Sequence, residues 1–313
     1  MTHDIPDKVP IPHPGDGPAS VHLFDEMSRW AIKAAIAAKR PLLIRGEPGV
    51  GKSQLAQAAA IALKRPFLSL VVNARTESQD LLYSFDAVHR LAQAQICNAV
   101  SGQKPEEVLA ESNFVHPGKL WWAFDWDDAA KQVKLINVPI PSTTDCDSKN
   151  GCVLLIDEID KAESDVPNGL LEALGSHSFP VRGRLEPVTV KGEPPLVVIT
   201  TNEDRVLPNA FIRRCLVMNI ELPENDDLQK LLVERGKAHQ PKLDEAILEA
   251  AAAELIKARN EQKHLRPRPG QAEYLDLIRA LAELGPQHKK LTPKKLLEKV
   301  KGFVLKKNAG TPG

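Results

Sequence analysis

Residues 46–53 read Gly-Glu-Pro-Gly-Val-Gly-Lys-Ser and match the phosphate-binding pattern G-x-x-x-x-G-K-[S/T] at every fixed position. An apolar run at 41–45 precedes them, and an alanine-rich stretch with helical character follows at 54–63. Glycines allow successive backbone N–H groups to converge on phosphates, and the positive end of the following helix adds to that attraction. The segment therefore predicts a strand, a phosphate-binding loop and a helix, as in nucleotide-binding α/β folds.

The residues of this loop have distinct expected roles. The ammonium of Lys52 should reach the outer phosphates, and the hydroxyl of Ser53 should bind Mg²⁺. The residues expected to contact the nucleotide are Gly46, Glu47, Pro48, Gly49, Val50, Gly51, Lys52, Ser53 and Gln54. The alternative is a glycine-rich turn with a solvated lysine, which the flanking strand and helix disfavour.

Further apolar runs predict the strands of one sheet. With 41–45 they make five candidates, the others lying at 66–73, 152–156, 196–201 and 215–220. Helical or loop segments separate them, and this alternation is typical of a mostly parallel sheet covered on both faces. The predicted fold class is α/β, with a five-stranded parallel sheet.

The composition of the chain divides it into domains. Residues 1–20 contain five prolines and no apolar period, which predicts an extended arm, and 21–38 carry one apolar helical face. The α/β domain is expected to span 21–223. Beyond it the pattern is wholly helical, which predicts a small all-α domain at 224–307 and a flexible tail at 308–313. Its candidate helices lie at 226–239, 243–259, 271–284 and 293–306.

Two carboxylates follow the apolar run that begins at Cys152. Ligands of open α/β sheets bind at the carboxyl ends of the strands, where this run delivers Asp157 and Glu158. We expect Asp157 to orient the hydrated Mg²⁺ and Glu158 to polarise the attacking water. The alternative, a strand that ends in solvated acids, is disfavoured by the phosphate-binding loop upstream.

Asn202 ends another apolar run, Leu196–Thr201. An amide at this edge could hydrogen-bond both the terminal phosphate and the attacking water. The alternative is that Asn202 only begins a turn.

Arg213 and Arg214 stand just before the last predicted strand. A guanidinium stabilises charge on a transferring phosphoryl group and can be supplied by a neighbouring subunit. Such a head-to-tail contact closes into a ring or makes a filament. The sequence leaves open which of the two arginines acts, and both could be ordinary surface charges.

The overall charge and the N-terminus disfavour a membrane protein and give no sign of nucleic-acid binding, which is not expected but not excluded. The 41 basic and 41 acidic residues cancel, so no whole-chain field favours nucleic acid or an anionic membrane. The N-terminus has neither a basic start nor an apolar stretch, and no run is long enough to span a bilayer. We therefore expect a cytoplasmic protein. The four cysteines form no C-x-x-C pair, so we expect reduced thiols, and the nine histidines have no ligand spacing, so we expect no metal other than Mg²⁺.

These motifs, in this order, resemble those of the AAA+ ATPases, and the sequence between the motifs resembles that of the MoxR-like branch. The stretches that carry the resemblance are Leu43–Ser53, Phe114–Leu120, Leu154–Ala162 and Gly169–Leu174. The likeness covers roughly 31–223, with a looser helical match to about 304.

The resemblance implies an α/β wedge with a helical lid and a ring, usually a hexamer, with ATP at the subunit boundaries. It implies ATP hydrolysis to ADP and phosphate with Mg²⁺, and a chaperone-like motor that remodels or activates partner proteins, often ones bearing von Willebrand A domains. Residues 179–190 alternate as in a hairpin, similar to the hairpin that faces the pore in this family, and 84–150 would hold further pore-side insertions. The alternative for 179–190 is a plain surface hairpin.

The chain also departs from the family pattern. The lid normally contributes an arginine to the nucleotide, and prolines surround both candidates here, of which Arg268 is preferred over Arg266. The polar insertion at 125–150 is longer than usual. Trp121 and Trp122 are expected to anchor a helix rather than bind a ligand. Two other functions stay open: a nucleic-acid-associated motor, and a nucleotide-gated scaffold with little turnover.

Overall fold

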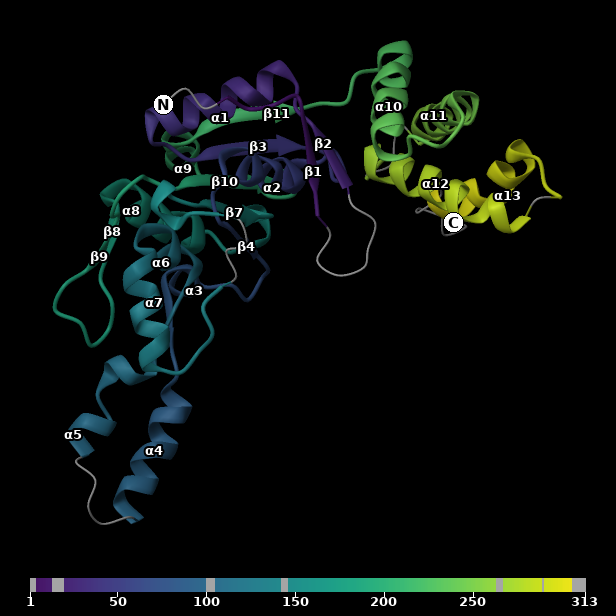
Figure 1. Cartoon of the computed structure of the whole chain (residues 1–313). Coiled ribbons are helices and arrows are strands. Elements are labelled where there is room, and N and C mark those ends of the chain that lie inside the picture. Colours follow the sequence, from purple (N-terminus) through teal and green to yellow (C-terminus); the bar gives the residue numbers. More distant parts are fainter. Residues whose placement is uncertain are drawn as a thin grey trace, which may run out of the picture. The chain divides into compact units, whose positions relative to one another are not determined.

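The computed structural model describes residues 4–12, 20–99, 105–141, 146–262, 267–288 and 290–305 (Figure 1). The chain forms two compact units. The sheet unit comprises 1–6, 24–44 and 56–218, and the lid unit comprises 7–23, 45–55 and 219–313. The phosphate-binding loop is thus counted with the helical C-terminal part.

A five-stranded parallel sheet forms the core of the fold, as predicted. Its strands, in spatial order, are β4 (Phe67–Val71), β7 (Val153–Asp157), β10 (Leu196–Thr201), β3 (Leu42–Gly46) and β11 (Leu216–Ile220). β7 pairs in parallel with β4 on one side and with β10 on the other. All six residues of β10 are buried, which explains why the central strands are continuous apolar runs rather than alternating ones.

One face of this sheet packs against the helices of the sheet unit. Alternate residues of a strand point to the same face, and Ile156 of β7 and Ile199 of β10 join one core with Trp121, Phe124 and Phe211. The helices that contribute to this core include α6 (Lys119–Phe124), α7 (Trp126–Leu135), α8 (Asp165–Ser176) and α9 (Asn209–Arg214). The sheet unit also holds α1 (Glu26–Ala38), and α2 (Lys52–Leu63) follows the phosphate-binding loop.

The two adjacent tryptophans anchor α6, as expected. Trp121 is fully buried, and its indole Nε1 donates a hydrogen bond to Asp128 Oδ2 at 2.9 Å. Arg184 donates two hydrogen bonds to the same carboxylate, at 2.6 and 3.1 Å. The segment 125–150, expected as a polar insertion, thus begins with helix α7, whose residues Ala129 and Val133 are buried.

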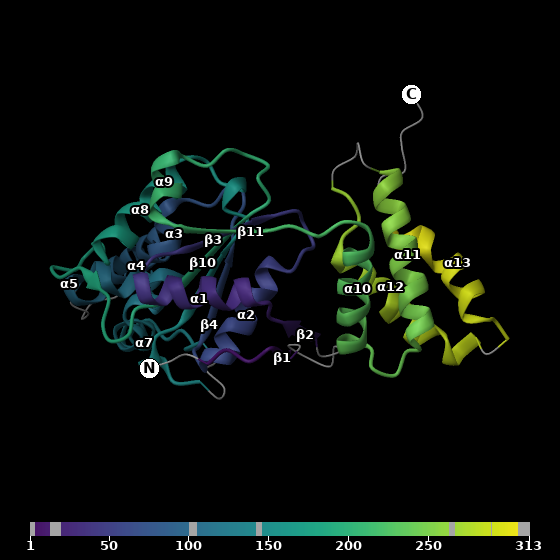
Figure 2. The same cartoon turned by 90° about the horizontal axis from the view of Figure 1, so that it is seen from above.

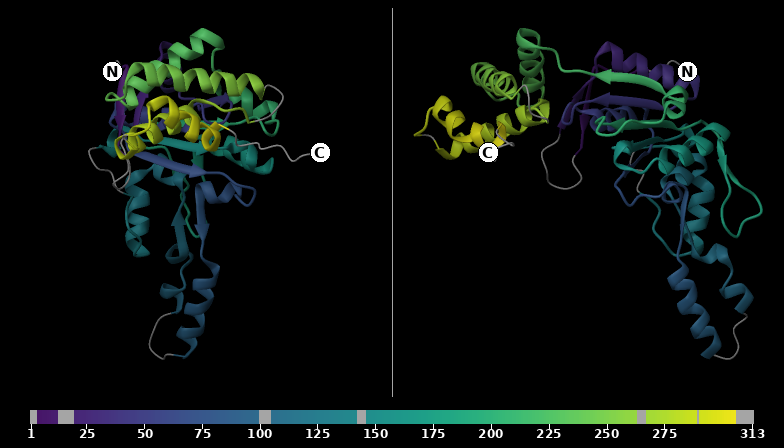
Figure 3. Two further views of the ribbon diagram at one scale, coloured as in Figure 1. Left: turned by 90° about the vertical axis from the view of Figure 1, so that its right-hand side faces the viewer. Right: turned by 180° about the vertical axis from the view of Figure 1, so that it is seen from behind.

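Apart from one helix of 13 residues, the remaining elements of the sheet unit are short. They are α3 (Ser78–Leu82), β5 (Tyr83–Phe85), α4 (Ala87–Ala99), α5 (Pro105–Val108), η1 (Glu111–Phe114), β6 (Val115–Pro117), η2 (Ser148–Asn150), η3 (Ile159–Lys161), β8 (Ser178–Phe179) and β9 (Val188–Thr189). β5 pairs with β6, and β8 pairs with β9 around the segment where a hairpin is predicted. Within this unit α4 and α5 extend away from the sheet (Figure 1, Figure 3).

The first predicted helix begins later than expected. Residues Ser20–Leu23 form strand β2, which pairs antiparallel with β1 (Lys8–Ile11), so a pair of strands replaces part of the expected arm and the start of the expected helix. Asp25 ends the extended backbone, and its carboxylate accepts a hydrogen bond from Ser28 N at 2.7 Å. An aspartate in this position stabilises a helix start, so α1 begins at Glu26. Residues 1–3 and 13–19 of the expected arm lie outside the described residues.

The C-terminal helices build a second hydrophobic core. They are α10 (Asn225–His239), α11 (Glu245–Glu261), α12 (Gln271–Leu284), η4 (Pro286–His288) and α13 (Pro293–Leu305) (Figure 2). Tyr274 lies fully buried among their leucines, and burial raises the pKa of its hydroxyl well above the ordinary value. The predicted tail, 308–313, lies outside the described residues. In the described part of the chain, none of the helices combines the length and the apolar character needed to cross a bilayer.

Candidate active site

The phosphate-binding loop connects β3 to α2. Two of its glycines, Gly46 and Gly51, occupy positions where a larger residue would clash or be strained. A Cβ on Gly46 would lie 2.4 Å from the carbonyl oxygen of Ile220 on β11, so only glycine fits there. Gly51 has a φ of +97°, which L side chains rarely adopt, and a Cβ on it would meet no described atom within 4 Å. The loop is therefore tightly packed where it leaves β3 and open where it enters α2, as a cradle for phosphate oxygens requires.

The lysine of the loop is held by the loop itself. Lys52 is buried, and its ammonium Nζ donates hydrogen bonds to the carbonyl oxygens of Gly46 and Glu47 at 2.7 and 3.0 Å. Its charge thus lies inside the turn of the loop. Gln54, two residues further along the chain, donates a hydrogen bond from its side-chain amide to Ser20 Oγ at 3.2 Å.

Glu47 links the loop to the lid helices. Its Oε1 accepts hydrogen bonds from Arg268 Nε and Nη2 at 3.2 and 2.6 Å, and its Oε2 accepts one from Arg259 Nη2 at 2.9 Å. Arg259 also donates from Nη1 to the carbonyl oxygen of Pro269 at 2.8 Å. Partial burial raises the pKa of Glu47, but the two guanidinium groups outweigh it and hold that pKa below the ordinary value. Arg268 therefore reaches the phosphate-binding loop through Glu47, and its predicted contact with the nucleotide stays a prediction. Arg266 lies outside the described residues.

The two predicted carboxylates lie at the end of β7, Asp157 as its last residue and Glu158 directly after it, and share a partner on β10. Thr200 Oγ1 donates to Asp157 Oδ1 at 2.5 Å and accepts from the backbone N–H of Glu158 at 2.9 Å. Glu158 adopts a left-handed backbone conformation, with φ of 59°. Non-glycine residues in this region cost free energy and cluster at functional sites. The threonine thus fixes the sharp turn that separates the two acids.

Glu158 and Asn202, predicted to act together, are in contact. Asn202 Nδ2 donates to Glu158 Oε1 at 3.2 Å, and Lys161 Nζ donates to Glu158 Oε2 at 2.5 Å. Glu158 raises the pKa of Lys161, so this lysine stays charged at neutral pH. Both oxygens of the carboxylate are therefore oriented, one by an amide and one by an ammonium.

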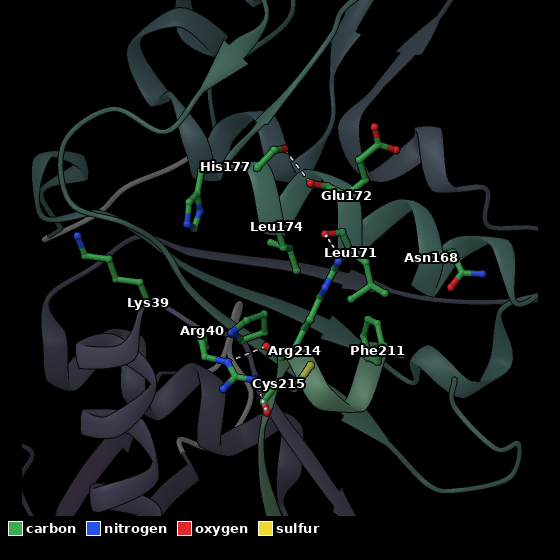
Figure 4. A pocket seen from close by; sticks show the side chains of 13 residues that line it. Lys39, Arg40, Asn168, Leu171, Glu172, Leu174, His177, Phe211, Arg214 and Cys215 are labelled. Atoms are coloured by element: carbon green, nitrogen blue, oxygen red, sulfur yellow. Dashed lines mark hydrogen bonds between the residues drawn. The ribbon is translucent and has the colours of Figure 1, made fainter. Parts of the chain in front are cut away.

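The predicted arginine pair ends helix α9, and the two side chains differ in their surroundings. Arg214 Nη1 donates to the carbonyl oxygen of Leu171 on α8 at 3.2 Å (Figure 4). It lines a cavity of about 730 Å³ together with Lys39, Glu172, His177 and Phe211. Both arginines are exposed, but the side chain of Arg213 makes no hydrogen bond or ion pair to the described residues. The hydrogen bond to Leu171 is thus what distinguishes Arg214 from Arg213.

The sequence analysis did not identify three side chains that contact the predicted site residues: Thr200, Lys161 and Arg259. Thr200 and Lys161 lie within predicted motifs, where a polar side chain at the end of a buried strand and a lysine three residues after an acid are weak signals. Arg259 lies on α11 and contacts Glu47 across 212 residues of sequence, so no local pattern identifies it.

Comparison with known proteins places these motifs in a family. The family model described as AAA domain (dynein-related subfamily) matches residues 41–215, which is more than half of the chain. No curated protein matches this chain.

Among solved structures, a variant of RuvB from Thermotoga maritima shares 14% identity with a TM-score of 0.50, over 88% of this chain and 68% of that one. Another, the Thermotoga maritima RuvB Holliday junction branch migration motor, shares 14% identity with a TM-score of 0.48, over 88% and 66%. The chain thus spans about two thirds of these structures. At 14% identity, the likeness to the first of them concerns the fold alone. On the extent of the family match, the chain belongs to the AAA domain family, dynein-related subfamily.

Proposed function

We propose that this chain is a MoxR-like AAA+ ATPase that hydrolyses ATP to ADP and phosphate with Mg²⁺, works as a ring, and remodels or activates a partner protein. The observation that carries the proposal is the orientation of Glu158, whose two carboxylate oxygens are held by Asn202 and Lys161. A carboxylate that is fixed in this way, directly after an acid suited to Mg²⁺, is what water activation requires.

The residues present fit ATP and Mg²⁺. Backbone N–H groups of 46–53 and Lys52 would hold the phosphates, and Ser53 with Asp157 would hold Mg²⁺, which supplies charge neutralisation of the phosphates when bound. Support for joining the loop and the acids comes from the strand order, because β3 neighbours β10 and β10 neighbours β7. The carboxyl ends of parallel strands meet at one edge of a sheet.

Each side chain would have one task in the reaction. Glu158 would accept a proton from the attacking water, while the amide of Asn202 would orient that water and contact the terminal phosphate. Arg268 would contact the nucleotide from the lid, formed by the helices from Asn225 to Leu305, and exchange Glu47 for phosphate oxygen.

Of the two arginines at the end of α9, we assign the trans role to Arg214. Its guanidinium is already oriented by Leu171, and preorganised charge stabilises a transition state better than a mobile one. An arginine given to the neighbouring site implies a head-to-tail ring, and the family resemblance makes a hexamer the expected size.

ATPase activity is tested by phosphate release from Glu158→Gln. This variant should bind ATP and lose about 100-fold or more of its turnover, as expected for removal of a general base. Glu163→Gln is the matched control, because Glu163 is exposed and pairs only at the surface with Arg205 at 3.3 Å. A Glu158→Gln variant that hydrolyses ATP at the native rate would remove the basis of the proposal. Lys52→Ala should abolish nucleotide binding.

The partner is tested with purified components. A von Willebrand A domain protein should bind the Glu158→Gln ring in the presence of ATP and dissociate when ATP is withdrawn. Turnover that is stimulated by DNA or RNA, with binding that weakens steeply with salt, would instead indicate a nucleic-acid motor. Nucleotide binding without phosphate release by the native ring would indicate a scaffold.

A further inference from the structure

Arg40 caps the end of the helix that carries the arginine pair. Its Nε donates to the carbonyl oxygen of Arg214 at 3.1 Å, and its Nη2 donates to that of Cys215 at 3.3 Å (Figure 4). Nη2 also donates to the carbonyl oxygen of Arg213. One guanidinium therefore binds three successive carbonyl groups at the C-terminus of α9.

This contact suits the physics of a short helix. The last carbonyl groups of a helix lack partners within it and carry partial negative charge, so a cation there is favourable. α9 has only six residues, too few to be stable through its own hydrogen bonds. A planar fork of N–H donors can satisfy several carbonyl groups at once, which the single ammonium of a lysine does less well.

Arg40 is itself fixed in place. It follows helix α1, and its backbone N–H donates to Ala35 O at 3.1 Å. Lys39, just before it, has the left-handed φ of 53° that turns the chain out of α1 toward β3. The backbone of Arg40 is thus held at a defined point between α1 and β3.

The side chain of Arg214 is held from the opposite direction. While Arg40 binds its carbonyl group, its own guanidinium binds Leu171 O on α8. The position of Arg214 therefore depends on two contacts, one of its backbone with Arg40 and one of its side chain with α8. Helix α8 follows η3 and the acid Glu158 in the chain.

The geometry points to Arg40 as a positioning residue for the trans arginine: it holds the end of α9 so that Arg214 meets the phosphates bound by the neighbouring subunit. This inference rests on the proposed function. An ordinary helix cap would stabilise its own subunit alone, whereas a positioning residue affects hydrolysis in the neighbour.

Arg40→Ala tests the first half of this distinction. Its kcat should fall by roughly 10- to 100-fold, the cost of misplacing a catalytic group by about 1 Å, while KM for ATP changes little because its own phosphate-binding loop is intact. Arg40→Lys, which keeps the charge but not the fork, should lie between Arg40→Ala and the native protein. Lys39→Gln removes a charge from the same cavity, and its kcat should stay near the native value. Rings are compared by size-exclusion chromatography and stability by thermal melting. A native kcat in Arg40→Ala would overturn the inference, and so would an equal loss in Lys39→Gln.

Mixed rings test the second half. Glu158→Gln subunits keep Arg40 and Arg214 but do not hydrolyse, whereas Arg40→Ala subunits keep an intact site but offer a misplaced arginine. Co-expression of the two, with a different tag on each, should give rings more active per Arg40→Ala subunit than Arg40→Ala rings alone. An Arg213→Ala/Arg214→Ala double variant mixed in the same way is the reference.

The reference separates the two possible failures. If the double variant is rescued by Glu158→Gln subunits and Arg40→Ala is not, Arg40 acts only within its own subunit and the inference is wrong. If neither is rescued, the arginines do not act in trans, and that part of the proposed function fails together with the inference. Rescue of both variants is the expected result.

Discussion

Arg259 of α11 and Glu47 of the phosphate-binding loop form an ion pair, with Nη2 and Oε2 2.9 Å apart. The side chain of Arg259 is only 10% exposed, and its other terminal nitrogen is bound to Pro269 O. Arg268 binds the second oxygen of the same carboxylate and is more exposed, at 27%. Arg259 thus forms the more buried link between the loop and the lid helices, and Arg268 forms the more exposed one.

Removal of Arg259 should destabilise the lid unit more than removal of Arg268. Arg259→Ala leaves Glu47 and Pro269 O short of a donor, and we expect a loss of about 2–3 kcal/mol in the free energy of unfolding, against about 1 kcal/mol for Arg268→Ala. Urea denaturation followed by circular dichroism measures both. A double-mutant cycle with Glu47→Ala isolates the pair, and a coupling energy indistinguishable from zero would contradict this view.

The Glu47 link should also make stability depend on pH at the acid end. The pKa of Glu47 is lowered from an ordinary value of 4.5, so its stabilising effect is present above pH 4.5 and is lost as the pH falls through the lowered pKa. Glu47→Gln should therefore be less stable than the native protein at neutral pH, and the difference should shrink toward pH 3. Denaturant titrations of both proteins across this range are the measurement. If the difference in stability between the two proteins grew as the pH falls, the prediction would be wrong.

Thr200→Val should impair hydrolysis without opening a cavity. Valine has a similar shape, but it neither donates to Asp157 nor accepts from Glu158 N, so both acids lose their fixed geometry. We expect kcat to fall by roughly 10-fold or more, and the Mg²⁺ concentration for half-maximal activity to rise. Thr189→Val on the exposed side of β9 is the matched control. Equal activity of the two variants over a Mg²⁺ titration would argue against a role for Thr200.

The thiol of Cys152 should be inert in the folded protein. Burial raises its pKa to about 12, although the nearby Arg65 lowers it, so almost no thiolate exists at neutral pH. Reaction with a chromogenic disulfide reagent should label Cys146, which is partly exposed, long before Cys152. Mass spectrometry of labelled peptides measures the order, and Cys146→Ser serves as the control. Fast labelling of Cys152 in the native state would mean that the start of β7 opens readily.

Patterns of neighbouring residues determined the five strands and the phosphate-binding loop. Leu154 and Ile156 lie in a strand buried on both faces, which forces a continuous apolar run, and Gly46 and Gly51 serve backbone needs that no other residue meets. Such local requirements can be recognised from the identities of neighbouring residues. At Val21 the helical periodicity predicted a helix, but the residue lies in a strand that pairs with β1, and this partner strand lies outside the short window in which periodicity is judged.

Tertiary structure alone decided which side chains meet. Arg259 reaches Glu47 across 212 residues, and Arg40 reaches the carbonyl group of Arg214 across 174. Contacts at such separations arise when independent helices pack, and a guanidinium that binds a distant carboxylate or carbonyl group looks, in sequence, like any other surface arginine. The motifs could therefore be identified from neighbouring residues, whereas the anchoring of Glu47 and Arg214 depends on how the helices fold together.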